Sequence, residues 1–245
     1  MIFYLSLPIL VMIVFGFNDI QGRLNLRWQG FTLKWYRELF AIPGLTTALR
    51  NSLAIAVVST IIATTLGTMI GLALGRYRFR GKSLYDLTIF SAISAPELVL
   101  GASLLSLFVT VQFVRGFTTI IIAHLAFSIS FVAVTVRARV LGLDPALEEA
   151  AQDLGADPWT TFRKITLPLL APGILAGGLL AFALSIDDYV VTSFVNGQVE
   201  TFPLWVYGAT RVGVPPQVNV MGTLIFLGGV AFAVGNAVAA RRQQA

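Results

Sequence analysis

Three acidic residues lie inside long apolar stretches of the sequence, where ionisable side chains are costly and usually functional. Glu97 follows Pro96 in the stretch 85–111, and Asp187 and Asp188 precede Tyr189 in the stretch 170–194. Carboxylates form charge-assisted hydrogen bonds with ammonium groups, and a tyrosine ring attracts cations through its face. These residues therefore predict a site for an amine cation. No lysine or arginine lies deep in an apolar stretch, which argues mildly against an anionic substrate.

Each acidic residue also has a structural explanation, which stays open at this point. A helix that breaks at Pro96 leaves Glu97 at a new helix N-terminus, about 18 Å into the membrane. One of Asp187 and Asp188 can cap a helix end or pair with Arg211. Adjacent helical residues point about 100° apart, so only one of the two aspartates is expected to face a pathway.

Other reactive patterns are weak or missing from the sequence. Gly81-Lys82-Ser83 resembles the end of a phosphate-binding loop, but Arg76 occupies a position where that motif requires glycine. No zinc-protease or nucleophile-elbow motif is present, and the chain has no cysteine. We therefore expect no catalytic residue, no metal site and no cofactor bound by this chain. His124, the single histidine, is expected to hydrogen-bond between helices rather than to relay protons.

The composition shows which kind of element must position these residues. Of 245 residues, 56% are hydrophobic and 12% are charged, and the mean hydropathy is +0.82. Soluble domains carry roughly twice that charged fraction, so the bilayer must solvate this chain. The net charge of +5 resides in short clusters between apolar stretches, which reflects membrane topology and not nucleic-acid binding.

We therefore predict an all-α integral membrane protein that forms one transmembrane domain over residues 1–245. A spanning helix needs roughly 20 apolar residues, and about six stretches meet that length. The predicted spans are 1–17, 47–75, 85–111, 117–136, 170–194 and 218–240. The first is expected to be a retained anchor and not a signal peptide, since no small-residue cleavage site lies near Asn18.

Basic residues predict the orientation of these spans. They cluster in the connections 76–83 and 137–167 and at Arg241 and Arg242, which the positive-inside rule assigns to the cytoplasm together with both chain ends. The connection 18–46 mixes both charges, and its segment 31–40 resembles an amphipathic stretch on the outer face. Within the second span, Gly67, Gly71 and Gly75 predict close helix packing inside the bundle, in preference to a subunit interface.

The connection 143–167 is long, polar and patterned as two short helices. Asp144 with Pro145 and Asp157 with Pro158 are typical helix starts, Gly155 is a typical helix end, and Pro168 is expected to stop the second helix. Two such helices would form a compact knob. Its apolar residues, which are Leu147, Leu154, Trp159 and Phe162, predict a docking surface for another protein. A connector packed under its own bundle is the alternative.

This loop also carries a family resemblance. Glu149-Ala150-Ala151, Gly155, and then Ile165, Leu167 and Pro168 match the "EAA" loop of ABC-importer permeases in residue type and spacing. The segments 94–101, 136–139, 185–194, 202–205 and 211–215, together with His124, resemble the second permease of spermidine/putrescine-type importers. The resemblance covers the chain from about residue 28 onward.

The resemblance implies a type I ABC-importer permease architecture in a prokaryotic inner or plasma membrane. It implies that the coupling residues contact a separate ATPase dimer, which holds the ATP and Mg²⁺; these residues are Glu149, Ala150, Ala151, Leu154, Gly155 and Pro158. It further implies a homologous second permease, an extracytoplasmic solute-binding protein and, as substrate, a polyamine. The alternatives are an ABC permease for another small solute, a gradient-driven transporter or channel, and a membrane scaffold or receptor without transport.

Overall fold

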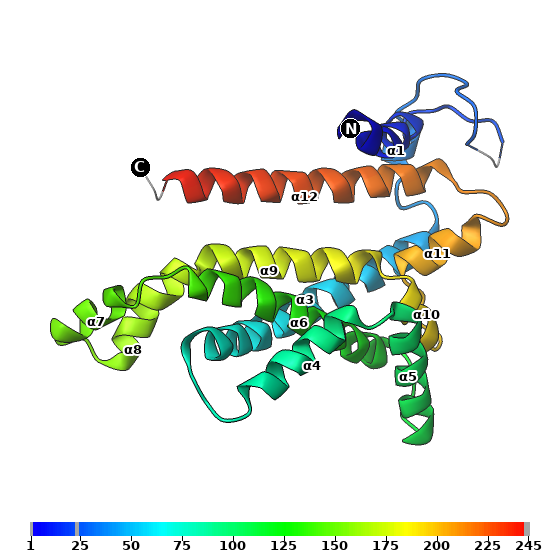
Figure 1. Ribbon diagram of the computed structural model, residues 1–245. Coiled ribbons are helices and arrows are strands. Elements are labelled where there is room, and N and C mark those ends of the chain that lie inside the picture. Colours follow the sequence, from blue (N-terminus) through cyan, green and yellow to red (C-terminus); the bar gives the residue numbers. More distant parts are fainter. Residues whose placement is uncertain (1, 23–24, 243–245) are drawn as a thin grey trace. The chain divides into compact units, whose positions relative to one another are not determined.

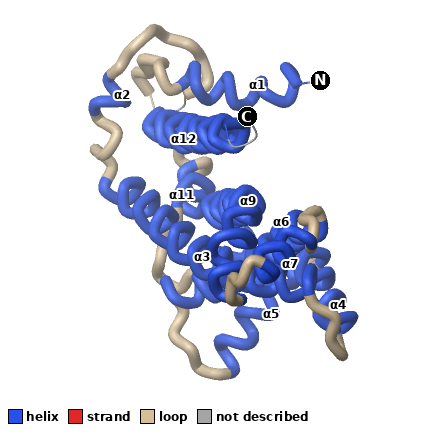
Figure 2. Tube along the Cα trace, turned by 90° about the vertical axis from the view of Figure 1, so that its left-hand side faces the viewer, coloured by secondary structure: helices blue, strands red, loops and turns tan. Residues whose placement is uncertain are grey.

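The computed structural model describes residues 2–22 and 25–242. In these residues the chain folds into helices joined by loops (Figures 1 and 2). An isolated antiparallel bridge pairs Asn18 with Phe31. The contacts divide the chain into two compact units, Asn51–Val199 and Met1–Arg50 with Glu200–Ala245. That the two units form the single transmembrane domain predicted above stays a prediction.

The all-α membrane architecture is confirmed. Among the described residues, four helical stretches are long and apolar enough to cross a membrane. They are α3 (Pro43–Arg76), α6 (Phe117–Leu141), the continuous run Pro158–Asp187 and the stretch Pro216–Gly235 of α12 (Pro216–Arg242). A fifth candidate is the pair α4 (Lys82–Ser94) and α5 (Glu97–Thr110), which bend by 106° at their junction.

The first predicted span corresponds to α1 (Ile2–Phe15), whose 14 residues fall short of the roughly 20 that a bilayer requires. Met1 lies outside the described residues. The segment predicted to lie along the outer face contains only one helical turn, α2 (Lys34–Arg37). Length therefore supports four spans, or five when the bent pair counts as one.

In the unit Asn51–Val199, α6 packs along α9 (Leu167–Asp187) and is also contacted by α4 and α10 (Val190–Val195). The glycines of α3 lie against α6. A Cβ added at Gly67 would lie 2.6 Å from Cβ of Val132, and one at Gly71 would lie 2.6 Å from the carbonyl oxygen of Ala133. The glycine face is thus needed for close packing inside the bundle, as predicted.

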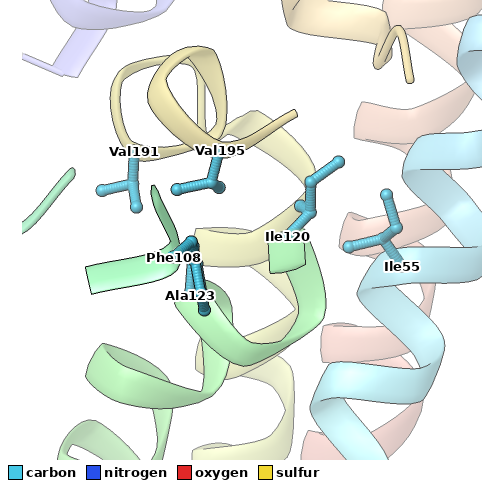
Figure 3. Close-up of a cluster of buried hydrophobic side chains, with 6 residues drawn as sticks. All are labelled: Ile55, Phe108, Ile120, Ala123, Val191 and Val195. Carbon is cyan, nitrogen blue, oxygen red and sulfur yellow. The ribbon is translucent and has the colours of Figure 1, made fainter. Parts of the chain in front are cut away.

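The predicted fifth span is broken near its end. The helix α9 ends at Asp187, Asp188 is extended with ψ of 118°, and α10 begins at Val190. Val191 and Val195 of α10 pack on Phe108 of α5 and Ala123 of α6 (Figure 3). The break therefore places a short apolar helix in the core and leaves the aspartates at the junction.

The connection 143–167 folds as the predicted knob. It contains α7 (Ala146–Asp153), α8 (Pro158–Thr161) and a π-helical segment, η1 (Phe162–Thr166). In Figure 1 the knob extends beyond the ends of α6 and α9. Asp144 accepts a hydrogen bond from the amide of Ala146, Asp157 caps α8, and Gly155 has the left-handed φ of +87° that glycine adopts without strain.

The prediction that Pro168 stops the second helix is wrong. The chain stays helical from Pro158 to Asp187, because η1 alters the hydrogen-bond register just before Pro168. The amide of Leu167 donates to the carbonyl of Phe162, five residues back. Proline has no amide hydrogen to contribute, and it is tolerated next to this wide turn, near the start of α9.

The other unit contains α1, α2, α11 (Phe202–Ala209) and α12, together with the first turns of α3. Its core is formed by Leu39, Leu45, Val218, Val220 and Met221. A cavity of about 600 Å³ lies within this unit. Buried Asn18 organises the loop after α1, since its side chain donates to the carbonyl of Arg27 and accepts from the amide of Gln29.

Candidate functional sites

A cavity in the unit Asn51–Val199 brings the predicted pathway residues together. It has a volume of about 320 Å³ and is bounded by α4, α5, α6 and the junction between α9 and α10. All four predicted residues line it, namely Glu97, Asp187, Asp188 and Tyr189. The apolar part of its wall includes Leu100, Phe127 and Phe131. The cavity therefore combines carboxylates with aromatic rings.

Glu97 owes its position to the break between α4 and α5. Ala95 and Pro96 are extended, and Glu97 is the first residue of α5. The predicted helix break is thus present, and it leaves Glu97 exposed in the first turn. The partial positive charge of a helix N-terminus attracts a carboxylate placed there. A stabilising position and a substrate-facing position are compatible for this residue.

The two aspartates have different roles in the geometry. Asp188 is turned inward, with a side chain only 7% exposed, and it caps α10. Its carboxylate accepts hydrogen bonds from the amide of Thr192 at 2.7 Å and from the hydroxyl of Thr192 at 2.6 Å. Asp187 is exposed and lines the cavity. Asp187 is therefore the more accessible of the two aspartates in the cavity.

A buried polar network supports the aspartate junction. His124 of α6 hydrogen-bonds Ser185 of α9 through Nδ1 at 2.6 Å and Thr192 of α10 through Nε2 at 2.9 Å. Its Nε2 lies 3.4 Å from Oδ2 of Asp188, and the hydroxyl of Ser185 is 3.0 Å from that of Ser59 on α3. The expected interhelical role of His124 is thus present.

The partners of His124 were missed by the sequence analysis. The available signal was the presence of isolated hydroxyl residues in apolar spans, since such residues hydrogen-bond across helices in membranes. Periodicity does not reveal which hydroxyl residues meet, because Ser59, Ser185 and Thr192 come from three separate helices.

The knob carries an exposed surface of mixed character. We define the docking surface as Leu147, Glu149, Ala150, Leu154 and Trp159, all of which are exposed. Leu154 is 90% and Trp159 is 66% exposed, whereas Ala151 and Phe162 are half-buried. Exposed apolar groups of this size on a rigid element indicate an interaction site. Of the four apolar residues predicted to dock, Leu147, Leu154 and Trp159 are exposed and Phe162 is half-buried.

The start of α8 is fixed by the exposed Asp157. Its carboxylate accepts hydrogen bonds from the amides of Trp159 and Thr160 and from the hydroxyl of Thr160. These bonds, led by that of the Thr160 hydroxyl, hold the pKa of Asp157 below its usual value. Together with Pro158 at the first helical position, this cap orients Trp159 on the docking surface.

Glu148, beside the predicted Glu149, is a second residue that the sequence analysis missed. Its Oε2 lies 2.6 Å from Nη2 of Arg76, at the end of α3. Its Oε1 accepts a hydrogen bond of 2.9 Å from the hydroxyl of Thr166 in η1. The sequence signal was a pair of adjacent acids on one short helix, whose side chains point about 100° apart.

Neither site has the ligands of a metal centre. Among the described residues, no three His, Asp or Glu side chains are grouped as metal ligands would be. The cavity itself offers carboxylates for charge attraction and hydrogen bonding, and aromatic rings for contact with cations.

Sequence comparison places the chain among known membrane proteins. Residues 67–244 match the family model described as "Binding-protein-dependent transport system inner membrane component". The chain is 41% identical over 239 residues to the spermidine/putrescine transport system permease protein PotC of Escherichia coli (strain K12). The matched region covers 97% of this chain and 90% of that protein. It is 38% identical to the putrescine transport system permease protein PotI of the same strain, over 93% of this chain and 83% of that protein.

Solved structures show the same fold at low sequence identity. A chain of the MetNI methionine ABC transporter in an inward-facing conformation superposes with a TM-score of 0.65 at 20% identity, covering 80% of this chain and 95% of that chain. A chain of a bacterial ABC transporter that imports the acidic polysaccharide alginate gives a TM-score of 0.61 at 18% identity, over 98% and 91% of the two chains.

Proposed function

Because the chain belongs to the family of binding-protein-dependent transport system inner membrane components, we propose that it forms the membrane pathway of an ATP-driven polyamine importer. The observation that carries the substrate class is the convergence of Glu97, Asp187 and Tyr189 on one cavity. The similarity to PotC and PotI supports the same class, since both names refer to putrescine.

A polyamine suits this cavity for simple chemical reasons. Its ammonium groups carry positive charge, and the exposed carboxylates of Glu97 and Asp187 supply charge-assisted acceptors. Tyr189 and Phe127 add aromatic faces for the methylene chain and for cation–π contact. Asp188 is engaged in capping α10 and therefore acts indirectly, by fixing the backbone next to Asp187.

The energy for transport comes from a separate ATPase dimer, which binds ATP and Mg²⁺. The docking surface supports this part of the proposal, because Leu154 and Trp159 are exposed on a short capped helical pair. Glu149 is exposed next to them and offers a carboxylate to a basic or amide group of the ATPase. The residues proposed for this contact are Glu149, Ala150, Ala151, Leu154, Gly155 and Pro158.

The transport cycle is alternating access, shared with a homologous second permease. A solute-binding protein delivers the substrate at the outer face, and closure of the ATPase dimer displaces the knob on the cytoplasmic face. The displaced knob moves the helices that bound the cavity, so that the cavity opens to one side at a time. Both chain ends lie in the cytoplasm in this arrangement.

Uptake by the reconstituted importer tests the substrate assignment. We expect Asp187→Asn and Glu97→Gln each to raise the KM for putrescine about tenfold, because each removes a charge-assisted hydrogen bond to an ammonium group. Glu38→Gln, which removes an exposed charge from the other unit, serves as the matched control. Wild-type KM values in both cavity variants would exclude the polyamine cavity.

Two further measurements separate the alternatives. Uptake that proceeds in vesicles without ATP, but follows an ion gradient, would identify a gradient-driven transporter. Uptake that requires ATP but does not compete with putrescine or spermidine would identify an importer of another small solute.

A further inference from the structure

Glu148 joins three elements that the sequence keeps apart. One carboxylate oxygen pairs with Arg76 at the C-terminal end of α3, at 2.6 Å, and the other accepts from Thr166 at the end of η1, at 2.9 Å. The Arg76 and Glu148 side chains are only 21% and 24% exposed, and Thr166 is buried. Both oxygens are thus occupied in a largely enclosed setting. We call Arg76, Glu148 and Thr166 the clamp.

The clamp lies on the inward side of the knob. Glu149, one residue further on, is exposed, as is Ala150. Because adjacent helical residues differ by about 100° in direction, the eight residues of α7 present one side to a docking protein and another to α3 and η1. A load applied to the outer side reaches the body of the unit through the contacts on the inner side.

The elements that the clamp joins continue toward the cavity. Beyond Thr166, η1 runs into α9, which ends at the cavity residue Asp187. Arg76 is the last residue of α3, and Ser59 lies earlier in the same helix. The hydroxyl of Ser59 lies 3.0 Å from that of Ser185 in the last turn of α9. The two helices held by Glu148 at the knob therefore meet again next to the cavity.

We propose that Glu148 is a positioning residue for coupled transport: it makes α7, α3 and α9 move as one body when the knob is displaced. This inference rests on the proposed function, in which an ATPase displaces the knob. The ion pair and the threonine hydrogen bond fix both the distance and the orientation of α7 relative to α3 and η1. A rotation of α7 is therefore passed on to these elements, as is a translation. Without it, α7 stays attached through the chain and through its packing on α8 and η1.

A charge swap in the reconstituted importer tests the clamp. Uptake per ATP hydrolysed is measured together with the amount of ATPase that co-purifies. We expect Glu148→Gln and Arg76→Gln each to retain wild-type ATPase binding and to lower uptake per ATP about tenfold, within the usual range of coupling between sites. The double variant Glu148→Arg with Arg76→Glu should recover most of the loss, since the ion pair is restored with reversed polarity and Thr166 can accept from the new arginine.

Two more variants keep the result interpretable. Thr166→Val removes one hydrogen bond and preserves the shape, so it should lower uptake per ATP by a smaller factor and still yield folded protein. Asp86→Asn breaks the ion pair with Arg137 that joins α4 to α6, where the side chains are 35% and 32% exposed. It serves as the control for loss of a helix-joining ion pair away from α7, and it should leave uptake per ATP unchanged.

The outcomes distinguish failure of the clamp from failure of the proposed function. Wild-type coupling in Glu148→Gln, or a swap no better than the single variants, would overturn the clamp. Equal losses of coupling in Asp86→Asn and Glu148→Gln would also overturn it, because the effect would then be general destabilisation. An unaltered chain that co-purifies with no ATPase, or whose ATPase binding is unaffected by Leu154→Asp, would instead refute the proposed function.

Discussion

At the scale of single residues, neighbouring identical side chains have acquired different tasks. Asp187 and Asp188 are adjacent, yet one is exposed to a cavity and the other caps a helix beside His124. Glu148 and Glu149 repeat this division, with one facing the protein and one facing outward. The physical causes differ. Successive side chains of α7 point about 100° apart, whereas α9 ends at Asp187 and the extended backbone of Asp188 turns its side chain inward.

The buried histidine gives a prediction at this scale. His124→Phe keeps an aromatic ring but removes the hydrogen bonds to Ser185 and Thr192. We expect it to lower the free energy of unfolding by about 1–3 kcal/mol, because buried hydroxyl groups lose a partner. His124→Gln can still reach Thr192 and should lose less. Thermal unfolding in detergent micelles measures both effects. Equal melting temperatures for His124→Phe, His124→Gln and the unaltered protein would show that the network contributes no stability.

At the scale of elements, the caps and breaks were predictable and their continuations were not. Asp157 with Pro158, and Gly155, are local signals, so the ends of α7 and the start of α8 follow from the sequence. The break at Pro96 follows for the same reason. Helical continuity through Pro168 depends on the register of η1, which no short motif encodes.

The cap of α8 gives a prediction about pH. The pKa of Asp157 is lowered by hydrogen bonds from Thr160, so its contribution is complete above the ordinary aspartate pKa of about 3.9. As the pH falls through the lowered folded-state value, that contribution is lost. We expect the hydrogen-exchange protection of the Trp159 and Thr160 amides to be constant from about pH 7 to pH 5 and to fall below about pH 4.

The control for this cap is Asp157→Asn, which keeps an acceptor oxygen and cannot ionise. Its protection should be lower at neutral pH and independent of pH over the same range. A wild-type profile that matches that of Asp157→Asn would show that the ionised carboxylate is not what holds α8.

At the scale of the whole molecule, composition was the most informative property. A chain with 12% charged residues and a mean hydropathy of +0.82 cannot fold around a water-exposed surface. The apolar stretches of roughly 20 residues then predicted that helices cross the membrane. The site was harder to anticipate. Glu97 and Asp187 were identified because acids are rare in spans. Arg76, Glu148 and Thr166 lie near polar helix ends, where such residue types are common and do not indicate a site.

Membrane orientation gives the prediction at this scale. The chain has no cysteine, so single substitutions report accessibility without background. Ser83→Cys and Gln152→Cys should react with a membrane-impermeant maleimide only from the cytoplasmic side, and Gln198→Cys only from the outer side, because arginine and lysine retain their loops in the cytoplasm. Labelling of Gln152→Cys from outside would invert the topology and remove the basis for ATPase docking.

The wide turn at Phe162–Thr166 has a consequence for how this chain tolerates changes of length. A π turn is equivalent to one extra residue accommodated inside an α-helix, and one residue corresponds to about 100° of rotation. Deleting a single residue there would let the helix regain ordinary winding with the side chains of α8 in nearly the same direction relative to α9, whereas closing the turn without a deletion would rotate them by about 100°. We therefore expect this segment to tolerate the loss of one residue without redirecting Trp159, which no other turn of ordinary α-helix would allow.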